Sequence, residues 1–126
     1  MTGLPHYSIE KTESFVRSFK KLAKSYRKEA IDILIAAIEG LISNPFPSKS
    51  RDETLPAKTP LPENWTFHKL EIWLGKGASG QIRLMYLVNE EVMEIRLLLI
   101  YSHEQYTKRP ADRDIRDVIA EALDKE

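Results

Sequence analysis

Three apolar segments in the second half of the chain, joined by short connections, place the strongest constraint on its fold. They are WTFHKLEIWL (65–74), QIRLMYLV (81–88) and VMEIRLLLIY (92–101). Each has the length and the β-branched and aromatic content of a strand, and the turns GKGASG and Asn89-Glu90-Glu91 lie between them. Connections this short join only antiparallel neighbours. The segments therefore predict a three-stranded antiparallel meander whose apolar face needs a cover.

Helical periodicity on both sides of the meander predicts that cover. Apolar residues recur every three or four positions in the first forty residues and again after Asp112, where an acidic first turn favours a helix. The central part of the segment KEAIDILIAAIEGLI is apolar nearly all round, which predicts a deeply buried helix. In chain order the predicted elements are a strand at 6–11, a helix that begins at Thr12 or Ser14, a helix at 28–42, the three strands and a helix at 111–126.

The stretch between the second helix and the meander, residues 44–64, holds five of the seven prolines and no periodic apolar pattern. We interpret it as an irregular surface loop. At 126 residues the chain has the size of a single domain. The sequence thus predicts one α+β domain spanning 1–126, with a small antiparallel twisted β-sheet, an N-terminal helical pair packed on one face and a C-terminal helix.

Several classes of chemistry find little support in the residue types present. The chain has no cysteine and three dispersed histidines without a metal-binding spacing, so we expect neither a metal nor any other cofactor. The glycines of GKGASG do not lead from a strand into a helix, which argues against a nucleotide-phosphate loop. The N-terminus lacks the apolar core of a signal peptide, and no apolar run is long enough to cross a bilayer. We therefore expect a cytoplasmic protein without a membrane partner.

The charges balance overall, with 19 basic and 19 acidic residues, which argues against a whole-surface field that attracts nucleic acid. Their distribution along the chain is uneven. Residues 10–30 are mainly basic and include Lys20, Lys21 and Lys24 on one predicted helix, whereas 112–126 are mainly acidic. The basic helix face could bind a polyanion or could simply favour solubility.

The predicted strands carry charged residues within their apolar patterns. Side chains alternate between the two faces of a sheet, which places Lys69, Glu71 and Trp73 on one face of their strand. The same alternation places Arg96 on the face opposite Tyr101. One sheet face is therefore expected to be charged and the other to be covered by the helices. On pattern alone, the charged residues could be a solvated surface tied by cross-strand ion pairs.

The last predicted strand ends in SHEQYTK, with His103 and Tyr106 where an ordinary turn would carry Gly, Asn or Asp. Taken singly, they could be a partly exposed strand-end histidine and an aromatic side chain that covers the edge of the core. Beside Arg and Lys they could also cleave RNA without a metal ion, because RNA carries its own nucleophile in the 2′-hydroxyl. Such a reaction needs a base, an acid and fixed cations near the phosphorus.

The order of the elements and several short patterns resemble the RelE/ParE superfamily of toxins from type II toxin–antitoxin systems. The patterns are SFVRSFKKLAKS, AIEGLISNP, FHKLEIWL, SGQIRLMYLV and IRLLLIYSHEQYTK, within roughly residues 7–108. The resemblance implies a RelE-like fold of microbial-RNase type. It also implies a ribosome-dependent, metal-independent mRNA endoribonuclease that a cognate antitoxin protein holds inactive. The helical extension at 111–126 lies beyond this core and could pack across the site or form a homodimer contact.

The resemblance assigns roles to individual residues. Arg83 matches the central-strand arginine that stabilises the transition state, and His103 matches a histidine that acts as general acid or base. Tyr106 matches an aromatic residue that stacks on a base or shares proton transfer. Lys69 matches a phosphate-contacting lysine, and Glu71 an alternative general base. The local basic residues with which the protein would bind mRNA and the ribosome are Lys20, Lys21 and Lys24.

Two other functions remain open at this stage. A protein of the same fold could bind without catalysing, as a gyrase-type inhibitor or as a domesticated, non-toxic binding homologue, and the neutral net charge favours this. The chain could also be an interaction module whose charged sheet face is solvated. The sequence does not fix whether His103 and Arg83 face each other, because one step of strand register reverses the face of a side chain.

Overall fold

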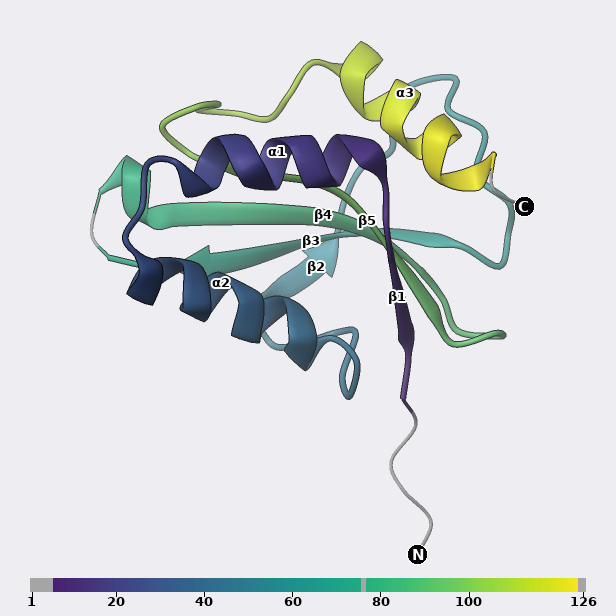
Figure 1. The fold of residues 1–126 in the computed structure, drawn as a ribbon. Coiled ribbons are helices and arrows are strands. Elements are labelled where there is room, and N and C mark those ends of the chain that lie inside the picture. Colours follow the sequence, from purple (N-terminus) through teal and green to yellow (C-terminus); the bar gives the residue numbers. More distant parts are fainter. Residues whose placement is uncertain (1–5, 76, 125–126) are drawn as a thin grey trace, which may run out of the picture.

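The chain folds around one five-stranded sheet, and a computed structural model describes residues 6–75 and 77–124 of it. The sheet order is β1-β5-β4-β3-β2, with α1 and α2 on one face and α3 on the other (Figure 1). This arrangement confirms the α+β class and the helical pair on one face. The elements are β1 (Ser8–Lys11), α1 (Glu13–Ala23), α2 (Lys28–Gly40), β2 (Ser50–Asp52), β3 (Thr66–Trp73), a 3₁₀ turn (Ala78–Gly80), β4 (Gln81–Asn89), β5 (Glu94–Ser102) and α3 (Asp112–Leu123).

The sheet is mixed rather than wholly antiparallel. β3, β4 and β5 form the predicted antiparallel meander, but β1 pairs in parallel with β5. Most of the chain lies between these two strands, so no tight turn fixes their relative direction. β1 therefore forms one edge of the sheet, beside the last strand of the meander.

The interpretation of residues 44–64 as wholly irregular is wrong for three residues. Ser50–Asp52 form β2, an edge strand antiparallel to β3 whose pairing begins at Ser50 and Leu70. A strand this short has no alternating pattern that could be distinguished from the prolines around it. Further along the same stretch, Leu55 and Leu61 pack on the sheet face that α3 covers.

The two N-terminal helices differ in how much of their surface is buried. α1 begins as predicted, because the hydroxyl of Thr12 accepts a hydrogen bond of 3.0 Å from the N–H of Phe15. The expectation that α2 is deeply buried is wrong, since Ile33 and Ile35 are exposed on its outer side. Only one side of α2 packs on the sheet, through Leu34 and Ile38. No helix within the described residues is long and apolar enough to cross a membrane.

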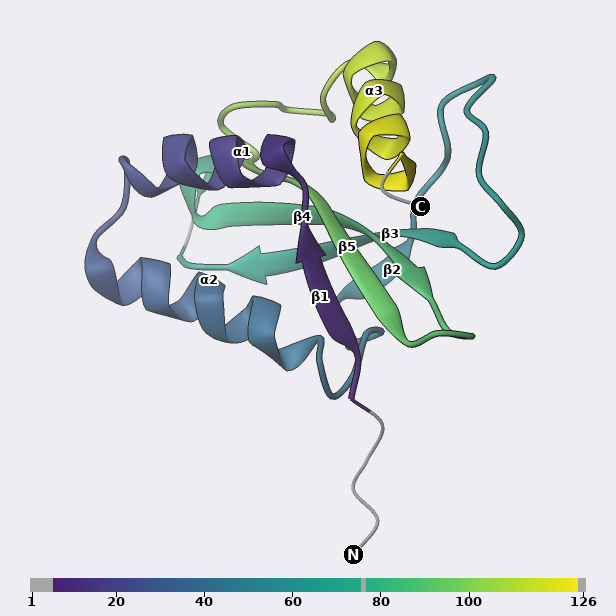
Figure 2. The ribbon, with the colours of Figure 1, turned by 45° about the vertical axis from the view of Figure 1, so that its right-hand side comes forward.

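The predicted terminal helix is α3, and residues 125–126 of that prediction lie outside the described residues. α3 buries Ile115, Val118 and Ile119 against Phe67 and Met85 of the sheet. This is the face on which the charged strand residues lie. The expectation that helices cover only the other face is therefore wrong, and α3 closes one half of the charged face (Figure 2).

Arg96 is a charged strand residue that α3 buries. Its guanidinium lies 4.6 Å from the ring centroid of Trp65 and donates a hydrogen bond of 2.8 Å to Glu94. It also donates to the carbonyl of Ala122 at the end of α3. A cation near the C-terminus of a helix stabilises that end. Glu94 and Arg96 thus support α3 rather than form a solvated surface.

A bulge in β5 changes the faces of the residues that follow it. The adjacent β4 residues Met85 and Tyr86 pair with Leu99 and Leu97, which leaves Leu98 as an extra residue. Both Leu98 and Leu99 lie on the face that α3 covers. Side-chain alternation beyond the bulge is therefore shifted by one residue.

Tyr101 is the first polar side chain that the bulge redirects. It belongs to the cluster under α3, on the same face as Arg96. The prediction that these two residues lie on opposite faces is wrong, because it assumed strict alternation through the strand. Without the bulge, the end of β5 would present its polar side chains to the face that α1 and α2 cover.

The Gly-rich connection between β3 and β4 forms the predicted hairpin turn. Gly77 has a φ of 84°, which is unfavourable for a residue with a side chain. A Cβ on Gly80 would lie 2.5 Å from the carbonyl oxygen of Gly75. The hydroxyl of Tyr26 donates to the carbonyl of Ser79, which ties this turn to the connection between α1 and α2.

Candidate active site

A polar cluster on three strands begins at the edge of the region that α3 covers, with the buried Tyr101, and continues onto the half of the charged face that α3 leaves open. Arg83 of β4 lies in register between Tyr101 of β5 and Glu71 of β3. One row nearer the β3–β4 turn, Gln81 lies opposite Trp73, and its carbonyl accepts a hydrogen bond of 2.8 Å from the N–H of His103. We refer to this surface as the polar sheet face; its residues are Lys69, Glu71, Trp73, Gln81, Arg83, Tyr101 and His103.

The side chains of Arg83 and His103 are in direct contact. Nη1 of Arg83 and Nδ1 of His103 are 3.0 Å apart. A guanidinium has no acceptor, so the imidazole Nδ1 accepts this hydrogen bond and a neutral ring then carries its proton on Nε2. Nε of Arg83 lies 4.0 Å from Oε2 of Glu71. The structure thus brings together three of the four residues predicted to be catalytic.

Glu71 is held between two arginines. Its Oε2 also accepts a hydrogen bond of 3.3 Å from Nη2 of Arg51 on β2. A carboxylate shared in this way orients the guanidinium of Arg83 and limits its movement. To act as a general base, Glu71 would have to leave both partners, so the geometry favours an orienting role.

Lys69 is part of a second ion-pair network. Its Nζ lies 3.3 Å from Oε1 of Glu53, and both side chains are largely buried. Glu53 also accepts a hydrogen bond of 2.9 Å from Arg109, which reaches Asp112 in the first turn of α3 at 3.0 Å. This network joins the start of α3 to the sheet. A phosphate would have to compete with Glu53 for the Lys69 ammonium.

Tyr101 is a site residue that sequence reasoning missed. Its side chain is 2% exposed, and its hydroxyl has no hydrogen-bond partner in the described part of the chain. Burial raises the pKa of Tyr101 to about 12; the charge of Glu53 adds to this shift, and Arg83 and Arg109 oppose it. The phenol is therefore protonated at neutral pH and has a hydrogen to donate. No sequence signal marks it, because the bulge alone brings it to this face.

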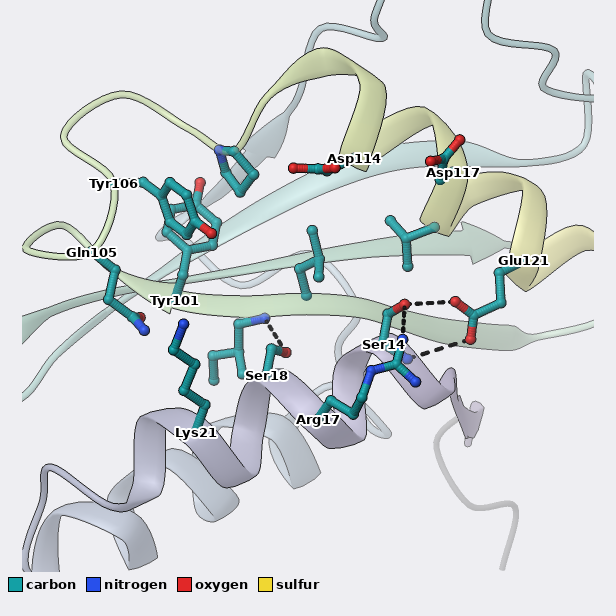
Figure 3. A pocket seen from close by; sticks show the side chains of 14 residues that line it. Ser14, Arg17, Ser18, Lys21, Tyr101, Gln105, Tyr106, Asp114, Asp117 and Glu121 are labelled. Carbon is teal, nitrogen blue, oxygen red and sulfur yellow. Dashed lines mark hydrogen bonds between the residues drawn. The ribbon is translucent and has the colours of Figure 1, made fainter.

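Tyr106, the fourth predicted catalytic residue, lies beside the polar sheet face rather than on it. Its ring meets the ring of Tyr101 edge-on, with centroids 5.5 Å apart. It lines a groove of about 520 Å³ between α1 and α3, into which Arg17 and Lys21 also point (Figure 3). Tyr106 can therefore contact a bound chain at the rim of the site.

The three lysines predicted to bind a polyanion do not share one surface. Lys21 faces the groove toward α3, whereas Lys20 lines a separate, more apolar groove between α1 and α2. Lys24 is the exposed C-cap residue of α1. Successive residues of a helix are rotated by about 100°, so Lys20 and Lys21 diverge. α1 thus offers no continuous basic stripe toward the polar sheet face.

The described residues contain no group of three or more His, Asp or Glu side chains that could hold a metal ion. The polar sheet face instead combines a guanidinium, an imidazole and a protonated phenol in one place. The arrangement suits proton transfer and charge stabilisation at a phosphate group.

Comparisons with known proteins find similarity in structure but not in sequence. No family model and no curated protein matches the chain. A chain of the archaeal RelE–RelB complex from Pyrococcus horikoshii OT3 has a TM-score of 0.54 at 14% identity, over 77% of this chain and 94% of that one. A double arginine-to-alanine mutant of the E. coli toxin RelE in the free state has a TM-score of 0.51 at 16% identity; the match covers 95% of this chain and 97% of that one.

A third solved structure, a conserved hypothetical protein from Helicobacter pylori, has a TM-score of 0.46 at 18% identity, over 79% of this chain and 97% of that one. The two structures with higher TM-scores confirm the RelE-like fold that the sequence patterns implied. At identities this low, the likeness establishes the fold alone.

Proposed function

We propose that this chain, which has the fold of RelE, is the toxin component of a type II toxin–antitoxin system and cleaves mRNA on the ribosome. The observation that carries the proposal is the hydrogen bond between Arg83 and His103 on the open half of the sheet. It puts a fixed cation next to a group that can transfer protons, which are two of the three components that RNA cleavage by the 2′-hydroxyl requires.

The reaction begins when a phosphate of the RNA takes the place of His103 as the acceptor for Arg83. Nδ1 of His103 is then free to remove the proton of the 2′-hydroxyl as the 2′-oxygen bonds to phosphorus. Arg83, held by Glu71, donates to the non-bridging oxygens on which negative charge develops. The bond from phosphorus to the 5′-oxygen breaks, leaving a 2′,3′-cyclic phosphate and a 5′-hydroxyl.

The departing 5′-oxygen needs a proton from a second group, because the ring of His103 is already engaged as the base. Tyr101 is the candidate, since it pairs with Arg83 in the sheet register and its hydroxyl has no hydrogen-bond partner within the described residues. Because this hydroxyl is buried, the bound RNA has to displace the side chains that cover it. The Tyr101 pKa of about 12 keeps the phenol protonated until it is used. Tyr106, at the rim, contacts the RNA instead of donating the proton.

The partners in this proposal are mRNA on the ribosome and a cognate antitoxin protein, with no cofactor. The neighbour from Pyrococcus horikoshii was solved as a RelE–RelB complex, which supports the expectation of a protein partner for this chain. The site would act in the cytoplasm, where translation takes place.

The test is to induce the wild-type protein, Arg83→Ala and His103→Ala in bacterial cells and to map new mRNA 5′ ends within minutes. We expect the wild type to stop growth and to produce new ends in translated regions. Each variant should lower the frequency of new ends by about a hundredfold or more. Arg113→Ala and His6→Ala remove the same side-chain types at exposed positions and should cleave as the wild type does.

Circular dichroism of the purified variants must first show an unchanged fold. Undiminished cleavage by both site variants would refute the assignment of the site. Normal growth without new ends, with soluble wild-type protein in the cells, would refute the nuclease and favour a non-enzymatic homologue. Filamentation with blocked DNA replication would instead indicate a gyrase-type inhibitor.

A further inference from the structure

We propose that Trp73 is a platform on which a base of the RNA stacks, beside the Arg83–His103 contact. The inference rests on the proposed function, because it describes how the same site holds its substrate. Trp73 ends β3 on the polar sheet face with 53% of its surface exposed. An indole exposed to this extent offers a flat aromatic face on which a base can stack.

The strand register fixes the place of Trp73 relative to the chemistry. Trp73 pairs with Gln81, and Gln81 accepts the N–H of His103 from its other side. These three residues therefore form one row across β3, β4 and β5, adjacent to the row that contains Arg83. Two strand spacings separate the backbones of Trp73 and His103 by about 10 Å. A base next to the cleaved bond can reach across this distance.

A cavity beside the indole provides room for such a base. It has a volume of about 490 Å³ and lies at the edge of β3, with Trp73, Glu71 and Lys49 on one side and Leu70, Ile72 and the end of α2 on the other. Here the carbonyl of Lys49 accepts a hydrogen bond of 3.1 Å from the N–H of Glu71, and the contact of this edge segment with β3 ends at Glu71. The edge of β3 beyond that residue is consequently accessible from the side.

The charges around the cavity favour RNA over an apolar protein segment. The ammonium of Lys49 lies 6.0 Å from the centroid of the Trp73 ring, near the outer limit of a cation–π contact. With Arg51 and Arg83 it supplies cations for the phosphates that flank a stacked base. An apolar segment would instead have to cover the polar side chains of Glu71 and Gln81.

Intrinsic fluorescence can test the proposal directly. The chain has two tryptophans, and the other, Trp65, is only 3% exposed, so a ligand in solution contacts Trp73 alone. The full-length protein is titrated with a short single-stranded RNA that carries 2′-deoxy positions to prevent cleavage. We expect quenching in the wild type and none in Trp73→Phe, whose remaining emission comes from the buried Trp65.

The affinity of each variant is measured separately, by anisotropy of the labelled RNA. Trp73→Phe keeps an aromatic ring and should bind within about threefold of the wild type, whereas Trp73→Ala should bind about tenfold more weakly or worse. Val92→Ala removes an apolar side chain that is 63% exposed in the β4–β5 turn and should bind as the wild type does. Duplex RNA hides the faces of its bases and should not quench.

Equal affinities of Trp73→Ala and the wild type, or no quenching at a single-strand concentration that saturates the anisotropy signal, would overturn the stacking proposal. Together with the mapping of mRNA ends, these measurements distinguish a failure of the stacking proposal from a failure of the proposed function. New mRNA ends made by a Trp73→Ala protein of unchanged affinity would refute the platform and leave the nuclease. Quenching in a wild-type protein that makes no new ends would refute the nuclease and leave the platform.

Discussion

His68 is a buried histidine on the sheet face opposite the candidate site. Its ring lies between those of Phe46 and Tyr86, with centroid separations of 4.9 and 5.6 Å. Nε2 is 2.6 Å from the hydroxyl of Thr66, and Nδ1 is 3.3 Å from a carboxylate oxygen of Asp52. Burial lowers the pKa of His68 below 6.5, although the charge of Asp52 acts in the opposite direction. The neutral ring is therefore the form that the folded protein prefers.

This preference predicts a loss of stability in mild acid. The folded-state pKa of His68 lies below its unfolded value of about 6.5, so protonation favours the unfolded chain. The neutral ring makes its full contribution to the free energy of unfolding above about pH 6.5. This contribution is lost as the pH falls through the folded-state pKa of His68. Urea unfolding should show a lower free energy of unfolding at about pH 5.5 than at about pH 7.5.

His68→Gln should flatten this pH dependence, and the exposed His6→Gln should retain it. A free energy of unfolding with the same pH dependence in His68→Gln and the wild type would show that other groups cause the effect. The substitution at a buried position also lowers the free energy of unfolding at every pH. The variants are therefore compared by the slope of the free energy of unfolding against pH and not by its absolute value.

Among the elements, the bulge in β5 decides which residues the candidate site contains. Arg83 and Glu71 alternate with apolar neighbours, so the sequence could predict the faces on which they lie. The residues of β5 after Arg96 read LLLIY and are apolar or aromatic without alternation. Nothing in that run indicates where an extra residue sits. From the sequence, a shared site of Arg83 and His103 could therefore be proposed, but whether their side chains lie on the same sheet face could not be predicted.

The terminal helix shows the same limit. Its apolar residues recur at helical spacing, which was enough to predict α3. The sheet face that it covers could not be predicted, because both faces of β4 are apolar over its second half. Because helices pack on both faces, the sheet has one hydrophobic cluster under α1 and α2 and a second under α3.

Polar contacts at its C-terminal end complement the apolar packing of α3. The carboxylate of Glu121 accepts a hydrogen bond of 2.8 Å from the N–H of Glu13. It also accepts one of 2.6 Å from the hydroxyl of Ser14 (Figure 3). It thereby supplies a negative charge at the N-terminus of α1, where unpaired N–H groups favour one. α3 is thus joined to an element that precedes it by about a hundred residues.

We expect the apolar contacts to dominate the docking of α3. Ile119 is fully buried, so Ile119→Ala should lower the free energy of unfolding by about 2–5 kcal/mol. Glu121→Ala should cost about 1 kcal/mol, the usual contribution of a charge at a helix terminus. Urea denaturation measures both, and the exposed Arg113→Ala should change stability little. An Ile119→Ala protein as stable as the wild type would mean that α3 does not pack on the sheet in solution.

Across the whole molecule, the basic N-terminal part and the acidic C-terminal part of the chain lie side by side. Arg17 and Lys21 of α1 line the same groove as Asp114 and Asp117 of α3 (Figure 3). Far from the groove, the electrostatic fields of these opposite charges largely cancel, in keeping with the zero net charge of the chain. The sequence revealed the charge asymmetry, but only the fold shows that the basic side of α1 faces an acidic helix.

Binding of RNA must then depend on a few local cations rather than on a field over the whole surface. On the polar sheet face and its edge, the cations available to a single strand are Lys49, Arg51 and Arg83. For single strands, each phosphate contact contributes about −0.7 to the slope of log K against log salt concentration. The expected slope for a short single-stranded RNA is therefore about −2.

Arg83→Ala should make this slope shallower by about 0.7, whereas Arg113→Ala, which removes the same charge from the exposed side of α3, should leave it unchanged. Anisotropy titrations at a series of salt concentrations measure both slopes. A wild-type slope of about −4 or steeper would mean that more phosphates are contacted than the polar sheet face can serve. Lys20, Lys21 and Lys24 would then have to bind RNA as well, and the local description of the site would be wrong.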